Sequence, residues 1–131
     1  MRLVLDASAA VEILINRDGS RRMAAMLSEA EQVSAPDLLI PEVTNALWKN
    51  HHLAGLPLDI CDAALSRLPR LVTRLVSSGE LHLEAFRLAR SEQTPAYDMF
   101  YLALAKREDA VLLTLDSRLK KLAKREGVRI E

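Results

Sequence analysis

Four acidic residues stand out in this sequence because each lies at one end of an apolar segment. Asp6 follows the run RLVL, and Asp116 follows AVLLTL. Glu42 and Asp98 lie near the starts of PEVTNALWKNHHLAG and AYDMFYLALAKRE, two segments with helical spacing. Carboxylates within a few Å of one another repel and raise each other's pKa, and a divalent cation such as Mg²⁺ or Mn²⁺ removes that conflict. The chemistry to consider is therefore that of a hard metal ion held by carboxylates.

Each acid also has a simpler interpretation when it is taken alone. In the first turn of a helix, Glu42 and Asp98 would complement the helix dipole. Asp6 and Asp116 would cap the helices that follow them. The choice between these interpretations depends on whether the fold brings the four acids together.

Periodicity and turn residues predict alternating strands and helices in one domain spanning residues 1–131, with no repeat and no linker. Strands are expected at residues 2–5, 32–36, 70–76 and 110–115, with a last short one at 128–130. Helices are expected at residues 7–15, 21–31, 41–55, 57–68, 79–92, 96–108 and 117–126. Pro41 suits the first position of its helix. The alternation predicts an α/β fold with a short central parallel sheet flanked by helices on both faces.

This topology predicts where the acids lie. The strands of an open parallel sheet all end at one edge, where ligands bind. Asp6 and Asp116 directly follow strands, so they belong to that edge. Helices that return between parallel strands begin at the same edge, which adds Glu42 and Asp98. The distances among the four depend on the strand order, which the sequence leaves open.

Composition narrows the class of protein. Of the 131 residues, half are hydrophobic, and 18 Lys and Arg balance 18 Asp and Glu. A neutral chain excludes nucleic-acid binding by bulk positive charge, so any such binding must use a local patch. The single cysteine, Cys61, allows no internal disulfide and is expected in the core. An acid at residue 6 and the lack of any long apolar run favour a cytoplasmic protein with no membrane association.

Four segments of the chain resemble the PIN-domain ribonucleases, and within them the VapC toxins of toxin–antitoxin pairs. They are LVLDASAAVEIL, SAPDLLIPEVTNALWK, PAYDMFYLALAKRE and AVLLTLDSRL, in the order of the family's four acidic motifs. The resemblance covers essentially the whole chain. It places the family's acids on Asp6, Glu42, Asp98 and Asp116.

The resemblance implies an endoribonuclease that depends on Mg²⁺ or Mn²⁺ and leaves a 5′-phosphate and a 3′-hydroxyl. It also implies a cognate VapB antitoxin that blocks the acidic groove, and a homodimer. Ser8 and Thr114 match hydroxyl residues often found beside the first and last acids, where they would orient a carboxylate or water or serve as a cap and a strand end. Ser117 and Arg118 stand where some relatives carry a further acid, which weakens the case for a second metal.

Several cations and apolar residues have two interpretations each. Four cations are interpreted either as contacts to RNA phosphates or as solvated surface residues: Arg17, Arg21, Arg22 and Lys49. The basic run in residues 117–126 is interpreted as balancing a helix dipole and aiding solubility. Leu47 and Trp48 on an apolar helix face are expected in the core, although a dimer contact is compatible with them. The three histidines have no metal-ligand spacing and are expected at the surface.

Three other classes of protein fit the sequence less well than the nuclease. A receiver domain needs adjacent acids after its first strand, and LVLDAS has one. A haloacid-dehalogenase-type phosphatase needs an Asp two places after the first, where this chain has Ser8. A non-catalytic PIN-like module that binds RNA or protein would tolerate loss of an acid, whereas all four are present. Metal-dependent cleavage separates the last alternative from the nuclease.

Overall fold

Four parallel strands form the centre of the molecule in the computed structural model, which describes residues 1–131. They are β1 (Arg2–Leu5), β2 (Gln32–Pro36), β3 (Arg74–Val76) and β4 (Val111–Leu113). Their order in the sheet is β3-β2-β1-β4, so β1 lies between β2 and β4. The pairing places Leu5 opposite Leu113, so that β1 and β4 end at the same level.

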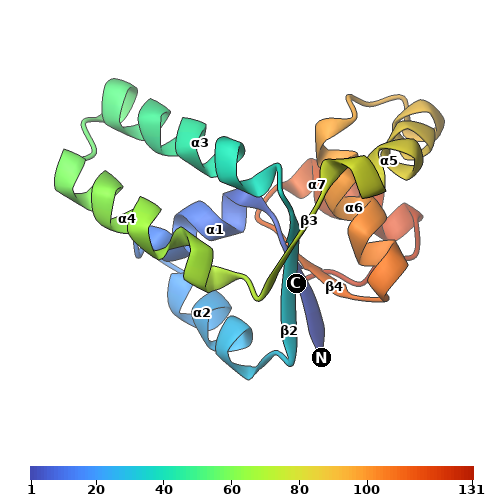
Figure 1. The fold of residues 1–131 in the computed structure, drawn as a ribbon, viewed down its shortest axis with the longest axis horizontal. Coiled ribbons are helices and arrows are strands. Elements are labelled where there is room, and N and C mark those ends of the chain that lie inside the picture. Colours follow the sequence, from blue (N-terminus) through green and yellow to red (C-terminus); the bar gives the residue numbers. More distant parts are fainter.

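Seven helices cover the two faces of this sheet (Figure 1). One side carries α1 (Ala7–Leu14), α2 (Ser20–Glu29), α3 (Leu39–Ala54) and α4 (Leu58–Leu71). The other side carries α5 (Ser78–Glu92), α6 (Tyr97–Glu108) and α7 (Ser117–Arg125). The predicted α/β fold, with a parallel sheet between two helical layers, is confirmed. No helix has the length and apolar character that crossing a membrane requires.

The core runs through the whole sheet because β1 is buried on both faces. Leu3, Val4 and Leu5 are completely buried, as expected for a central strand with helices on either side. On one face, α6 packs against β1, β2 and β4. Its buried side chains include Met99, directly after Asp98, and Leu102, one turn further on. The acid at the head of this helix is therefore anchored by a rigid apolar segment.

Several predicted elements differ from the structure in their bounds or type. The strand expected at 70–76 is wrong in its first part, because α4 continues to Leu71 and β3 begins only at Arg74. Partly buried Leu71, three residues after buried Leu68, packs against the core, so the helical period continues past the predicted end. The strand expected at 128–130 is a single bridge between Leu112 and Ile130. The helix expected from Pro41 begins at Leu39.

The far end of α3 corrects two further predictions. Leu47 is buried, but Trp48 is 56% exposed, so it does not belong to the core. The Trp48 ring instead stacks on His52, with 4.9 Å between ring centroids. His51 is half-buried and its Nδ1 lies 2.7 Å from the carbonyl oxygen of Leu56, so it is not a solvated surface residue. Cys61 is buried, as predicted.

Candidate active site

The strand order brings the four acids to the carboxyl edge of the sheet. Asp6 directly follows β1 and caps α1, and Asp116 follows β4 and caps α7. Glu42 and Asp98 lie in the first turns of α3 and α6. Each of Asp6, Glu42 and Asp98 has its pKa raised in part by the charge of a neighbouring acid of this set. The four residues therefore form one electrostatic group, which we call the acid cluster.

Asp6 is the most buried and most firmly held member of the acid cluster. Its side chain is fixed by three hydrogen bonds, and the residue is only 5% exposed. Oδ1 accepts from the Ser8 hydroxyl at 2.7 Å and from the Ala9 backbone N–H at 3.0 Å, and Oδ2 accepts from the Thr114 hydroxyl at 2.5 Å. Burial raises the pKa of Asp6 to about 6 even though these hydrogen bonds favour the charged form.

The hydroxyl groups of Ser8 and Thr114 tie the ends of β1 and β4 together through Asp6. The Ser8 hydroxyl also accepts from the Leu115 backbone N–H at 3.0 Å. The Thr114 hydroxyl accepts from the Asp116 backbone N–H at 3.0 Å. The backbone that leads from β4 to Asp116 is therefore fixed by the same groups that hold Asp6.

Glu42 is held by a residue that the sequence did not single out. The Tyr101 hydroxyl donates to Oε1 of Glu42 at 2.5 Å, and Tyr101 is 1% exposed. Burial raises the pKa of Glu42, and the charge of Asp98 adds to the effect. Burial and the charge of Glu42 raise the pKa of Tyr101 well above its ordinary value, so its proton stays on the hydroxyl. Tyr101 lies three residues after Asp98 and hence on the same helical face, which was the available signal.

Asp98 is the least constrained acid of the cluster. No hydrogen bond to either of its carboxylate oxygens is present, whereas Oδ1 of Asp116 accepts from the N–H groups of Arg118 and Leu119 at 2.9 and 3.2 Å. Burial raises the pKa of Asp98, the charge of Asp116 raises it further, and the Arg118 guanidinium opposes the shift. Arg118 is therefore the cation that the structure places beside the acid cluster.

The donor set of the acid cluster fits a hard cation. It offers only carboxylate and hydroxyl oxygens, which are the ligands that Mg²⁺ and Mn²⁺ prefer. Oε2 of Glu42, Oδ2 of Asp116 and both oxygens of Asp98 take no hydrogen bond within the protein and remain available to a ligand. No three His, Cys, Asp or Glu side chains converge as a preformed metal site.

The four cations suggested as RNA contacts hydrogen-bond to no member of the acid cluster. Arg17 donates to the Asn50 side chain at 2.5 Å, and Arg22 lies 3.0 Å from Glu131. Arg21 and Lys49 are exposed and have no ion-pair partner. Arg17 lies beyond the end of α1, and Lys49 lies in the second half of α3. Both helices begin at the acidic edge and run away from it, so neither residue is near the start of its helix. Their contact with RNA stays a prediction.

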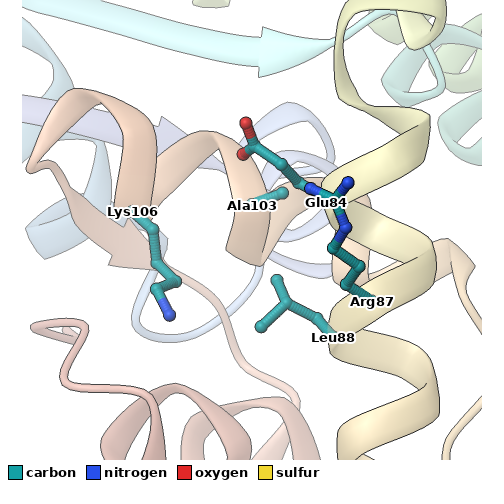
Figure 2. Close-up of a pocket in the computed structure, with 5 residues that line it drawn as sticks. All are labelled: Glu84, Arg87, Leu88, Ala103 and Lys106. Carbon is teal, nitrogen blue, oxygen red and sulfur yellow. The ribbon is translucent and has the colours of Figure 1, made fainter.

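A hollow of about 220 Å³ between α5 and α6 is separate from the acid cluster (Figure 2). Its lining includes Glu84, Arg87 and Lys106. Lys106 pairs with Glu126 at 2.8 Å, and Glu84 pairs with Arg107 at 3.1 Å. Most of its charges are therefore neutralised within the protein, and none of its lining residues belongs to the acid cluster.

The comparisons with known proteins agree with the fold. The PIN domain family model matches residues 3–125. Ribonuclease VapC3 of Pyrobaculum aerophilum is 34% identical over 121 residues, which is 91% of this chain and 92% of that protein. The crystal structure of PAE2754 from the same organism superposes with a TM-score of 0.77 at 23% identity, over 99% of this chain and 83% of that one. The crystal structure of VapBC2 from Rickettsia felis, bound to a DNA fragment from its promoter, superposes with a TM-score of 0.70 at 13% identity. The match covers 100% of this chain and 98% of that one. The chain belongs to the PIN-domain family and, within it, to the VapC ribonucleases.

Proposed function

We propose that this protein is the toxin of a toxin–antitoxin pair and that it cuts RNA internally with the help of Mg²⁺ or Mn²⁺ held by the acid cluster. The observation that carries the proposal is the gathering of Asp6, Glu42, Asp98 and Asp116 at one edge, with raised pKa values for the first three. A bound divalent ion supplies a water of lowered pKa and stabilises negative charge on the phosphate.

The residues of the acid cluster have different tasks in this proposal. Asp6 and Asp116, fixed by neighbouring hydroxyl or backbone groups, give the site a rigid base. Glu42 and Asp98 have unbonded oxygens directed by their own helices and complete the ligand set. A carboxylate with a raised pKa also takes up a proton more readily near neutral pH. Where Glu42 holds the ion through a water and not directly, its Oε2 would accept a proton of that attacking water. Hydrolysis by this route leaves a 5′-phosphate and a 3′-hydroxyl.

The first experiment compares the wild type with Asp98→Asn on a pool of structured RNA in Mg²⁺, in Mn²⁺ and in EDTA. Asparagine keeps the size of the side chain but removes the charge that attracts the cation. The matched control is Asp59→Asn, since Asp59 also lies in the first turn of a helix but is exposed and outside the acid cluster. We expect metal-dependent cleavage by the wild type and by the control, and loss of cleavage in Asp98→Asn.

Two results would count against the proposal. Cleavage that persists in Asp98→Asn would mean that the site is misplaced or that another nuclease is present. A folded wild type that neither cuts RNA nor binds Mn²⁺ would favour the non-catalytic PIN-like module instead. Mn²⁺ binding is measured by titration calorimetry, so metal binding and cleavage are tested separately.

The proposed partners are RNA, a VapB-type antitoxin and a second copy of the chain. Among the solved structures with this fold, VapBC2 contains both a toxin and its antitoxin, which supports a similar partner here. Exposed apolar side chains near the tips of α3 and α4, namely Trp48, Leu53 and Leu58, are available for an interface. Light scattering on the purified protein tests the dimer, which would have twice the chain mass of 14.6 kDa.

A further inference from the structure

A second hollow of about 310 Å³ lies beside the acid cluster and differs from it in charge. It is formed by the end of α5, the connection to α6 and one side of α7 along its whole length, and we call it the basic hollow. Its charged residues are Arg118, Lys121, Arg125 and Glu92. Three cations thus face one acid, although the chain as a whole is neutral.

Two of the three cations in the basic hollow are not neutralised by the protein. Arg125 is paired with Glu92, whose Oε1 accepts from Nε at 3.0 Å. Lys121 is exposed and has neither an ion-pair nor a hydrogen-bond partner. Arg118 donates to the hydroxyl of Thr94, a neutral group, and has no partner carboxylate within ion-pair distance. The hollow therefore offers two positive charges to a ligand.

The helix dipole does not account for these two positions. Cations are stabilised near the C-terminus of a helix, where Lys124 and Arg125 lie, and are disfavoured near the N-terminus. Arg118 occupies the first turn of α7, and Lys121 lies in its middle. The backbone N–H groups of Arg118 and Leu119 are already bonded to Asp116, so an anion in the hollow would be held by side chains.

Arg118 connects the basic hollow to the acid cluster. It lines the hollow, and its charge also lowers the pKa of Asp98. An RNA strand that presents one phosphate to four carboxylates is repelled by them until cations compensate. A neighbouring phosphate of the same strand, placed in the basic hollow, would be attracted by the cations there, and this attraction would offset the repulsion.

From this arrangement we propose that the basic hollow is the subsite for an RNA phosphate adjacent to the one that is cut, with Lys121 and Arg118 as its ligands. The inference rests on the proposed nuclease function and deepens it. A polar lining with cations and the hydroxyl of Thr94 suits a sugar–phosphate backbone, whose contacts carry position without sequence. A protein segment would need an apolar floor, and Leu122 is the one hydrophobic residue of the lining.

The test compares Lys121→Gln with Lys124→Gln, an equal loss of charge three residues further along the same helix and outside the hollow. Binding of a short mixed-sequence single-stranded RNA is followed by fluorescence anisotropy in EDTA at several salt concentrations. KM and kcat for cleavage are measured with Mg²⁺. We expect Lys121→Gln to weaken RNA binding several-fold, to lower the slope of log affinity against log salt by about 0.7 and to raise KM. Lys124→Gln should match the wild type, and Arg118→Gln should weaken binding as Lys121→Gln does.

The two levels of the proposal fail in different ways. Equal RNA affinity and equal KM in Lys121→Gln and Lys124→Gln, with normal cleavage by both, would overturn the subsite and leave the nuclease standing. A wild type that neither binds nor cuts RNA would overturn both.

Discussion

Tyr101 shows how a single buried side chain sets the position of a catalytic candidate. Its hydroxyl donates to Oε1 of Glu42, so Tyr101→Phe leaves Glu42 free to rotate and removes the hydrogen bond that favours its charged form. We expect kcat for RNA cleavage to fall about tenfold, which corresponds to about 1.4 kcal/mol. The limb of the pH–rate profile that reports Glu42 should move to higher pH.

The matched control for this variant is Tyr97→Phe, which alters an exposed tyrosine on the same helix. Because Tyr101 acts through Glu42, the pH profile distinguishes a positioning role from a loss of stability. A fall in kcat with an unshifted profile would show that Tyr101 only supports the packing of α6. Equal rates in the two variants would remove Tyr101 from the site altogether.

At the scale of residues, the sequence identified groups whose role follows from type and spacing. An acid directly after a strand, as with Asp6, belongs to the ligand-binding edge in any parallel α/β fold. Tyr101 lies in an apolar run and is indistinguishable from a core aromatic until Glu42, 59 residues away, is placed next to it. In the sequence, Arg118 is distinguished only by standing where some relatives carry an acid. The pattern of residues along the sequence does not show which distant segments come into contact.

At the scale of elements, Thr114 joins β4 to β1 through a hydroxyl group with two partners. It donates to Oδ2 of Asp6 and accepts from the backbone N–H of Asp116. Thr114→Val keeps the shape of the side chain but leaves both partners unsatisfied in a buried position. We expect the free energy of unfolding to fall by about 1–3 kcal/mol, measured by urea denaturation.

Thr114→Ser is the control because it keeps the hydroxyl and loses only a methyl group. It should retain most of the cleavage activity, whereas Thr114→Val should lose activity as well as stability. If both variants lose the same stability, the packing of the methyl group, and not the hydrogen bonds, connects the two strands.

The predicted elements were most accurate where the apolar residues of a segment followed only one pattern, that of a helix or that of a strand. The strands at 2–5 and 32–36 agree with β1 and β2. The strand expected at 110–115 is shorter, since pairing with β1 ends at Leu113 and Thr114 turns to Asp6. The error at 70–76 arose because an apolar run of this length fits a helix end as well as a strand. There the packing of Leu71, the last residue of α4, against the core decided the outcome.

At the scale of the molecule, the order of the strands decides whether the acids meet. The order β3-β2-β1-β4 puts β1 at the centre, so that Asp6 lies between the elements that carry Glu42 and Asp116. Local patterns do not encode this order, because it results from the packing of helices far apart in the chain. The fold also separates charge, placing the acid cluster and the basic hollow side by side in a chain with no net charge.

The free energy of unfolding should depend on pH because Asp6 of the acid cluster is buried. The pKa of Asp6 rises from 3.8 to about 6 on folding, so between these values the folded protein holds a proton that the unfolded chain has lost. The free energy of unfolding therefore decreases as pH rises through this window, by up to about 3 kcal/mol from this residue. Asp6→Asn removes the buried charge, and we expect it to gain stability relative to wild type by roughly this amount from about pH 4 to about pH 7.

Urea denaturation of both proteins in EDTA measures this difference, and addition of Mn²⁺ tests its connection to metal binding. The cation binds the folded state, so it should stabilise the wild type near neutral pH more than Asp6→Asn. A stability difference between the two proteins that is constant across pH would mean that Asp6 titrates near its ordinary pKa. Equal stabilisation of both proteins by Mn²⁺ would mean that Asp6 is not one of the ligands, and the ion would then have to be held by Glu42, Asp98 and Asp116 alone.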